Sequence, residues 1–332
     1  MHKTPDLLSN RPDHADSGID VVGDILDAVH LTTAVFGRLE LGAPWRLRIP
    51  DRGYLSFYIV ARGSAWIEVD GAPAEQPALA LSAGDAVLLP RGSDHTLRDG
   101  DRSEAPPHDF DYAVCPRVAI GESARFGGSG PVTSLVTGQF TFGGSASRNP
   151  LLSSLPALVH LPANATATNP QLAGVVPLIL SESANPGPGA TIVLARLADL
   201  LLIHTLRYWI GTDGAESCGL HAVADRVVGA ALRLMHARPA ESWTVESLAS
   251  AVALSRSAFA ARFSRLVGEP PLQYLARWRM TKAALLLNTG ERSIADIAGQ
   301  VGYGSPVAFT KAFSRVHGIG PGAYRRAHRM SE

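Results

Sequence analysis

The sequence predicts an α+β fold in which an N-terminal antiparallel β-barrel is followed by an all-α domain with two helix-turn-helix motifs joined by a linker helix. Three observations lead to this prediction. Short strand-like runs separated by glycine turns occupy much of residues 33–89. A unit of about 50 residues occurs twice within residues 245–324. The charge divides between the same regions, because residues 1–218 hold 15 Lys or Arg and 23 Asp or Glu, whereas residues 219–332 hold 15 and 7.

Length and composition fit a two-domain protein of the cytoplasm. A chain of 332 residues is long enough for two domains of ordinary size. Residues 1–18 are polar and lack the apolar stretch of a signal peptide, so we expect a loose tail and a cytoplasmic location. The two cysteines, Cys115 and Cys218, have neither a disulfide pattern nor zinc-site spacing. We expect reduced thiols, with Cys115 acting either as a single-thiol redox sensor or as a small apolar core residue.

Residues 19–145 are expected to form one β domain. A short amphipathic helix is predicted at residues 20–29. Strand-like runs then alternate with turns marked by glycines such as Gly63 and Gly84, which is typical of a small antiparallel barrel or sandwich. The predicted strands cover residues 33–39, 45–48, 55–61, 64–69 and 86–89, with a further pair within residues 135–142.

One motif in this domain indicates its type. Residues 84–95 combine a glycine turn, a strand, a Pro-x-Gly turn and His95, and they resemble the second motif of the cupin family. The resemblance implies a cupin-like β-barrel that acts as an effector or sensor domain. In enzymatic cupins the first motif supplies two histidines and a glutamate to a metal. Here the equivalent residues 49–56 contain no histidine, and Ser56 stands at the glutamate position.

This departure bears on the chemistry of the β domain. A lone His95 cannot hold a catalytic metal that needs three protein ligands. We therefore expect no metal site, no cofactor and no enzymatic activity. Tyr58 and His95 are predicted to line the pocket of an unknown small-molecule effector, and a structural role for His95 is the alternative.

Residues 146–212 are expected to be a helical segment that ends in a dimerisation helix. An apolar helix is predicted at residues 150–161, and a loop or broken segment at residues 163–189. The apolar run 190–210 approaches the length of a membrane-spanning helix, but its charged side chains would be costly in a bilayer. We expect either a homodimer interface or a helix packed on the barrel, and no membrane. Residues 213–220 are predicted to be a linker.

The duplicated unit consists of two helices joined by a tight turn. Residues 248–252 align with residues 297–301, and residues 259–265 align with residues 309–315. The first copy is one residue shorter, and the difference falls in the turn. Beyond the second helix of each copy the alignment continues through three matched pairs, which are Gly268 and Gly318, Pro271 and Pro321, and Tyr274 and Tyr324.

Each copy has the signals of a helix-turn-helix motif. Apolar residues recur at helical spacing on both sides of a short break. Ser255 and Ser305 stand where an N-cap is expected, and Gly268 and Gly318 stand where a left-handed residue ends a helix. A helical bundle that happens to be duplicated is the alternative. The predicted motifs cover about residues 244–267 and 293–317, in a domain of residues 221–330 whose first helix is residues 221–236.

Between the copies, residues 271–288 have one continuous helical pattern. At about 1.5 Å per residue such a helix spans roughly 27 Å. This length is close to the roughly 34 Å of one turn of duplex DNA. Two recognition helices separated by this spacer are therefore able to enter successive major grooves on one face of the duplex.

Several sequences in this region resemble one protein family. They are Ser255-Arg256-Ser257-Ala258-Phe259 and residues 268–275, 294–298, 301–303 and 320–325. These sequences resemble the AraC/XylS family of bacterial transcriptional regulators, and Ala43-Pro44-Trp45 resembles the cupin-type sensor of some AraC-like regulators. The resemblance implies double-stranded DNA and a small-molecule effector as partners, a homodimer formed through residues 190–210, and RNA polymerase if the protein is an activator.

Helical positions predict which residues meet DNA. Phe259 and Phe263 face inward, so small residues point outward from the first recognition helix. Lys311 on the second is the strongest candidate for a guanine contact, and residues 305–317 are expected to carry more of the base discrimination. Base reading is predicted for Ser257, Ala260, Ala261, Pro306, Val307, Thr310 and Lys311. Phosphate contact is predicted for Ser255, Arg256, Arg262, Arg265, Arg279, Ser305 and Arg315, and a solvated surface charge is the alternative for each arginine.

The sequence thus predicts a DNA-binding transcriptional regulator whose cupin-like domain senses an effector or mediates dimerisation. A cupin enzyme fused to a DNA-binding module is the first alternative, and stoichiometric metal in the purified protein would favour it. A binding-only architectural protein is the second alternative. Footprints of equal strength on random DNA and on a specific promoter region would favour that class.

Overall fold

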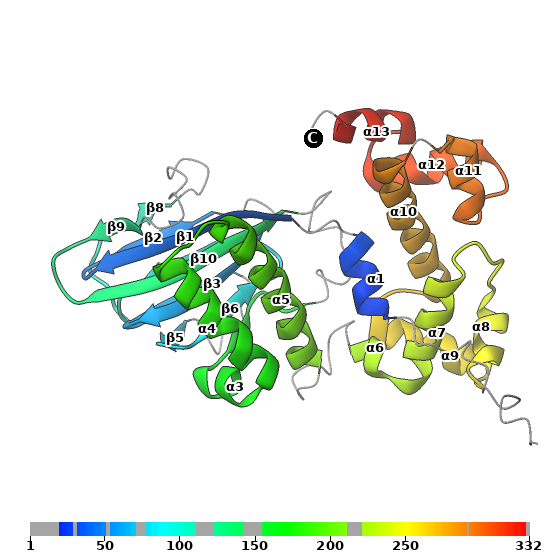
Figure 1. Cartoon of the computed structure of the whole chain (residues 1–332). Coiled ribbons are helices and arrows are strands. Elements are labelled where there is room, and N and C mark those ends of the chain that lie inside the picture. Colours follow the sequence, from blue (N-terminus) through cyan, green and yellow to red (C-terminus); the bar gives the residue numbers. More distant parts are fainter. Residues whose placement is uncertain are drawn as a thin grey trace, which may run out of the picture. The chain divides into compact units, whose positions relative to one another are not determined.

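The computed structural model describes residues 20–28, 32–50, 54–70, 78–110, 123–141, 155–210, 221–290 and 292–329 (Figure 1). They form two compact units, and each is described by itself. One unit is built on β-sheets and reaches from Thr32 to Ala224, whereas the other is helical and combines Val21–Ala28 with the chain from Asp225 onward. Cys115 and Cys218 lie outside the described residues, so the expectations for their thiols stay predictions.

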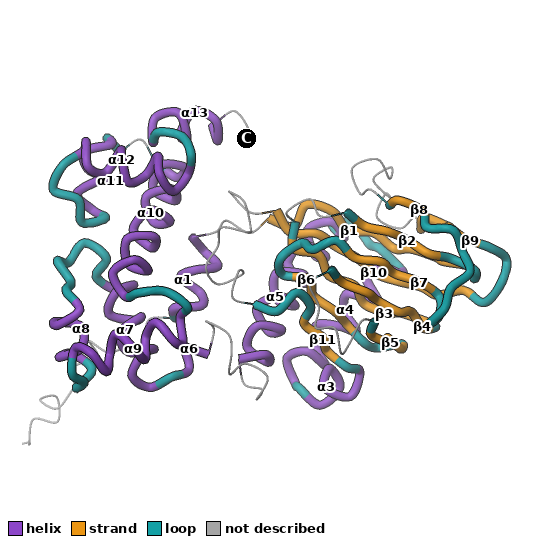
Figure 2. Tube along the Cα trace, turned by 180° about the vertical axis from the view of Figure 1, so that it is seen from behind, coloured by secondary structure: helices purple, strands orange, loops and turns teal. Residues whose placement is uncertain are grey.

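The β-rich unit contains a six-stranded sheet and a five-stranded sheet (Figure 2). In the six-stranded sheet the order is β11 (Val159–Leu161), β6 (Ala86–Leu89), β3 (Leu55–Arg62), β10 (Val132–Thr141), β1 (Thr32–Gly42) and β9 (Ser123–Gly127). In the five-stranded sheet it is β5 (Leu79–Ser82), β4 (Ser64–Val69), β7 (His95–Arg98), β2 (Arg46–Ile49) and β8 (His108–Asp109). Of the described pairs, β1 with β9 and β2 with β8 are parallel and the others are antiparallel.

These strands confirm the α+β prediction and most of the predicted β segments. Each of the first five predicted runs is a strand in the structure, namely β1, β2, β3, β4 and β6. The predicted pair at residues 135–142 is instead one strand, β10, which lies between β3 and β1. Within the described residues no ladder joins the two sheets into a closed barrel, so the cupin-like domain is a two-sheet sandwich.

The main core of this unit lies between the two sheets. Leu39, Tyr58 and Leu135 from the six-stranded sheet pack with Leu47 and Ile67 from the five-stranded sheet, and all are at most 2% exposed. Strand β4 alternates between buried and more exposed residues, as expected for a sheet with one covered face. Strand β3 is buried along six consecutive positions, because helices cover the other face of its sheet (Figures 1 and 2).

Three helices follow β11, and two predictions for this region are wrong. They are α3 (Ala163–Thr168), α4 (Pro170–Ala184) and α5 (Ala190–Ile210). The predicted helix at residues 150–161 is not found, because residues 159–161 pair with β6, while residues 150–154 lie outside the described part. The predicted loop at residues 163–189 is largely helical, because Asn169 accepts hydrogen bonds from two backbone N–H groups and Pro170 occupies the first helical position.

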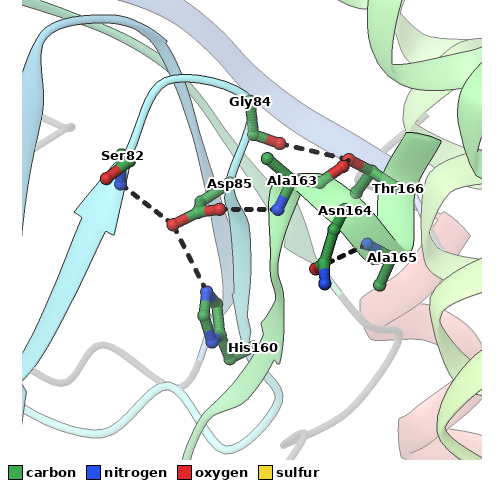
Figure 3. Close-up of polar contacts among 8 residues, drawn as sticks. All are labelled: Ser82, Gly84, Asp85, His160, Ala163, Asn164, Ala165 and Thr166. Carbon is green, nitrogen blue, oxygen red and sulfur yellow. Dashed lines mark hydrogen bonds and ion pairs between the residues drawn. The ribbon is translucent and has the colours of Figure 1, made fainter.

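Asp85 connects the β5–β6 turn to the start of this helical segment (Figure 3). Its carboxylate accepts hydrogen bonds from the backbone N–H of Ser82 at 2.9 Å and of Ala163 at 2.6 Å. His160 Nε2 lies 3.5 Å from the same carboxylate, and the Thr166 hydroxyl donates to the Gly84 carbonyl at 3.3 Å. The second cupin-type motif therefore also fixes where α3 begins.

The helical unit contains α7 (Arg226–Ala237), α8 (Val245–Ala251), α9 (Arg256–Val267), α10 (Pro271–Thr289), α11 (Ile294–Gln300), α12 (Pro306–His317) and α13 (Pro321–Arg329). The predicted helix at residues 221–236 is divided into α6 (His221–Ala224) and α7, since Asp225 caps α7 through the N–H groups of Val227 and Val228. The short N-terminal helix α1 (Val21–Ala28) packs against α7 and α10. Although residues 20–29 were predicted as part of the sensor region, α1 belongs to the helical unit.

We predict that Asp85→Ala lowers the free energy of unfolding by about 1–3 kcal/mol, because two backbone donors lose their acceptor in a partly buried place. Urea denaturation measures the change. Asp85→Asn is the matched variant, because its amide oxygen still accepts one hydrogen bond, and a smaller loss is expected. Equal stability of the alanine variant and the native chain would contradict the prediction.

Candidate nucleic-acid interface

The two helix-turn-helix units have the same internal packing. In the first, α9 buries Phe259 and Phe263, and in the second, α12 buries Phe309 and Phe313. All four rings are 0% exposed, and the two rings of each pair are 5.7 Å apart between centroids. Gly268 and Gly318 have φ of +86° and +78°, so both left-handed ends are confirmed.

The turns of the two motifs adopt the same left-handed conformation with different residues. Gly302 follows α11 with φ of +82°, and Ala253 follows α8 with φ of +56°. The two positions are equivalent when residues 248–252 are aligned with residues 297–301. Alanine is strained in this region because its Cβ approaches the following carbonyl oxygen, whereas glycine is not. The first motif therefore has the more strained turn.

Helix α10 supplies apolar side chains to both motifs. Leu275 and Trp278 are buried toward its first end, and Met280, Ala283 and Leu287 are buried in the core of the second motif. The structure gives α10 the bounds Pro271–Thr289, which confirms the predicted linker helix.

Arg279 holds the middle of α10 in place. Its guanidinium donates to the carbonyl oxygens of Pro239 at 2.7 Å and Glu241 at 2.8 Å, both in the segment between α7 and α8. A Cβ at Gly302 would lie 2.8 Å from the Ala240 carbonyl oxygen and 3.0 Å from the Arg279 guanidinium carbon. The segment between α7 and α8, the linker helix and the turn of the second motif thus meet at Arg279. A phosphate contact of Arg279 stays a prediction beside this structural role.

His236 lies inside the first half of the unit, and both of its ring nitrogens have partners. Nδ1 is 3.3 Å from the Asp24 carboxylate on α1, and Nε2 is 2.7 Å from the Tyr274 hydroxyl. The ring stacks on Trp278 with 3.9 Å between centroids. Burial lowers the pKa of His236 despite the opposing effect of Asp24, while the hydrogen bond from His236 lowers the pKa of Asp24. A neutral ring with its proton on Nδ1 satisfies all three groups.

The predicted base-reading residues lie on the outer faces of α9 and α12. Ser257 and Ala261 are exposed on α9, whereas Ala260 is half-buried. On α12 the outer face is formed by four residues, of which Thr310 is half-buried and the other three, Pro306, Val307 and Lys311, are exposed. Val307 is 65% exposed, so its apolar side chain is available for contact with the methyl group of thymine.

The predicted phosphate-binding arginines fall into two groups. Arg256 Nε lies 2.6 Å from the Glu246 carboxylate, and Arg262 Nη2 lies 2.6 Å from the carboxylate of Asp225. The hydrogen bond from Arg262 contributes to the lowered pKa of Asp225 against the opposing effect of burial. Arg265 and Arg315 are exposed, and within the described residues no carboxylate pairs with them.

The two serines before the recognition helices differ. The Ser255 hydroxyl accepts a hydrogen bond from the backbone N–H of Ala258 at 3.3 Å, so its capping role is confirmed. Ser305 occupies the predicted N-cap position of α12, but its hydroxyl makes no cap hydrogen bond. Pro306 occupies the first helical position, as predicted.

The carboxylates that hold Arg256 and Arg262 were not identified from the sequence. Asp225 is 37 residues from Arg262, and no local pattern indicates that they meet. Glu246 and Arg256 belong to different helices of one motif. The spacing within a known helix-turn-helix would have been the only available signal for this second pair.

Comparison with known proteins agrees with both units. A cupin family profile matches residues 20–211, and a helix-turn-helix domain profile matches residues 248–327. An AraC-like transcription regulator of Streptomyces lividans is 38% identical over 309 residues, which cover 93% of this chain and 98% of that protein. The chain belongs to the AraC-like family of transcription regulators. A second such regulator, from Streptomyces antibioticus, is 37% identical with coverage of 93% and 99%.

Among solved structures, the DNA-binding domain of the global transcriptional factor AdpA in complex with a target DNA is similar to part of this AraC-like chain. The sequence identity is 36%, the match covers 32% of this chain and 96% of that one, and the TM-score is 0.31.

The predicted effector residues of this AraC-like regulator meet inside the cupin-type domain. The Tyr58 hydroxyl lies 2.7 Å from His95 Nε2, and His95 Nδ1 lies 2.8 Å from the Ser93 carbonyl oxygen. Tyr58 is 1% exposed and His95 is 4% exposed. Since Tyr58 belongs to β3 and His95 to β7, their hydrogen bond crosses between the two sheets. Both residues are thus interior groups with partners already in place.

Two features are absent from the part of the chain that the structure describes. No three His, Cys, Asp or Glu side chains in the described ranges come together as a metal-ion site would require. Of the helices in those ranges, none has both the length and the apolar character needed to cross a membrane.

We predict that the native chain loses more stability than His236→Phe as the pH falls from 7 to 5.5. The folded pKa of His236 lies below the unfolded value near 6.5, so the unfolded state binds more protons in this range. The stabilising contribution of the neutral ring is complete above pH 6.5 and declines below it. Urea denaturation at both pH values, followed by far-ultraviolet circular dichroism, measures the difference. Parallel losses in the two proteins would refute this account.

We also predict that Ala253→Gly raises the free energy of unfolding by about 0.5–1 kcal/mol, because glycine removes the left-handed strain. Ala251→Gly at the end of α8 is the matched control, and it should lower stability by about 0.5–1 kcal/mol. Thermal denaturation of the two variants gives the signs. A destabilised Ala253→Gly variant would show that the turn is not strained.

Proposed function

We propose that this AraC-like regulator binds double-stranded DNA with both helix-turn-helix units and that its cupin-type domain responds to a small-molecule effector. One observation supports the DNA-binding mode above the others. The recognition helices α9 and α12 are exposed on their outer faces, while a single helix, α10, packs its two ends into their cores. Such a spacer is about as long as one turn of duplex DNA.

Helix α12 is proposed to carry most of the base discrimination. Lys311 offers a cation to the O6 and N7 acceptors of guanine, and Thr310 offers a hydroxyl and a methyl group. Val307, together with Pro306, offers apolar surface to the methyl group of thymine. On α9 the outward Ser257, Ala260 and Ala261 are small, so weaker reading is expected there.

Phosphate contacts are proposed for the exposed cations beside these faces. Arg265 on α9 and Arg315 on α12 are available without breaking an ion pair in the described part of the chain. The hydroxyls of Ser255 and Ser305 lie before the two helices, where backbone and hydroxyl donors commonly meet phosphate. Arg256 is able to contribute once it leaves Glu246.

The cupin-type domain is proposed to supply regulation. An effector that enters near Tyr58 and His95 would exchange their mutual hydrogen bond for bonds to the ligand. Helix α5 is proposed as the homodimer interface, since it exposes Ile192 at 68%, Val193 at 42% and Leu200 at 42%. A regulator with these partners acts in the cytoplasm, and it contacts RNA polymerase if it is an activator.

Selection of duplexes from a random library by the purified chain tests this function. Enrichment of one sequence, confirmed by gel shift against random duplex, is the expected result. Binding of random and selected duplex with equal affinity would favour an architectural role instead.

For Lys311→Ala we predict a loss of about 1–3 kcal/mol at the selected duplex and relaxed preference at one base pair. Arg326→Ala is the control, because it removes one exposed cation of α13 from the same half of the unit. The control should leave discrimination between the selected and random duplexes unchanged. Gel-shift titration measures both ratios. The Lys311 assignment fails if its variant discriminates as well as the native chain.

A further inference from the structure

The two helix-turn-helix units differ in charge. Residues 221–270, which contain the first unit, hold six Lys or Arg and four Asp or Glu, for a net charge of +2. Residues 292–329, which contain the second unit, hold six and one, for a net charge of +5. Since non-specific DNA affinity depends mainly on available cations, the second unit has the stronger electrostatic attraction to the duplex.

The carboxylates of residues 221–270 are paired with arginines, and three of these arginines belong to the same residues. The pairs are Asp225 with Arg262, Glu241 with Arg238, Glu246 with Arg256, and Glu269 with Arg277 of α10. Two of these arginines, Arg256 and Arg262, belong to the recognition helix α9. On α12, by contrast, Lys311 and Arg315 have no carboxylate within ion-pair distance among the described residues. The single acidic residue of residues 292–329, Asp296, is bound to Ser293 at the start of α11.

The two pairs on α9 differ in how easily DNA could replace them. Asp225 binds Arg262 with both carboxylate oxygens and also caps α7, so its removal would damage the fold. The Glu246–Arg256 pair is more open, with side-chain exposures of 59% and 69%. Glu246 has no part in the capping of α8, which is performed by Thr244 and Ser247. An exposed ion pair of this kind is weak and exchanges readily.

We propose that Glu246 is a positioning residue that sets the DNA affinity of the first helix-turn-helix unit by holding Arg256. DNA binding by α9 is then an exchange, in which a phosphate oxygen replaces the Glu246 carboxylate on the Arg256 guanidinium. No such exchange is needed at Lys311 or Arg315. The second unit therefore contributes more of the DNA affinity, and the first unit binds its half-site more weakly. This inference rests on the proposed DNA-binding function.

The test compares Glu246→Gln in the full-length chain with the matched variant Glu241→Gln. Both changes remove one carboxylate of an exposed pair, but Arg238, the partner of Glu241, is not on a recognition helix. Gel shift at several salt concentrations, with a random-sequence duplex and with the selected duplex, gives the affinity and its salt dependence. For Glu246→Gln we expect an affinity increase of about two- to fivefold. We also expect an unchanged slope of log K against log salt, because Arg256 contacts one phosphate in the complex with or without Glu246.

A double-mutant cycle distinguishes release of Arg256 from a simple change of net charge. In an Arg256→Gln background, Glu246→Gln should have no effect on affinity or slope. An effect that persists in this background, or an equal effect of Glu241→Gln, would overturn the inference. A slope steeper by about 0.9 in the single variant would overturn it as well, because Arg256 would then contact a phosphate only in the absence of Glu246. If the native chain binds neither duplex, the proposed DNA-binding function itself fails, which is a separate outcome.

Discussion

Both helix-turn-helix units depend on burying their phenylalanine pairs, and neither can do so without α10. The four rings are completely buried, although each motif consists of only two short helices. Burial of such side chains stabilises the fold by about 1.5–3 kcal/mol each. Arg279 then fixes the two halves against each other through carbonyl oxygens of the first and the turn of the second. The spacing of the recognition helices is therefore a property of the core rather than of the DNA-facing surface.

The same arrangement separates residues that hold the unit together from residues available to DNA. Arginines that look alike in the sequence have different surroundings, since Arg262 and Arg279 are bound by the protein while Arg265 and Arg315 face solvent. Carboxylates are present mainly in the half that contains α9. The two copies of the motif thus share the same core packing but differ in surface charge. This difference allows the two halves to serve unequal roles.

Local patterns in the sequence predicted much of this structure. Helical periodicity and the repeat identified the four motif helices and α10, and alternation with glycine turns identified five strands. Helix α4 was missed, although Pro170 directly after Asn169 marks a helix start. The protein partners of Arg262 and Arg279 were missed for a different reason. Their acceptors lie 37 to 40 residues away, where only the folded chain brings them together.

Helix α1 has a consequence for how the protein is made. It precedes β1 in the chain, but Asp24 binds His236, which follows 212 residues later. Ribosomes add about 5–20 residues per second, so α1 leaves the ribosome roughly 10–40 s before its binding site has been synthesised. During that interval the whole β-rich unit is produced between the two partners. The helical unit is thus the last part of the chain to be complete, although its helix α1 was translated first.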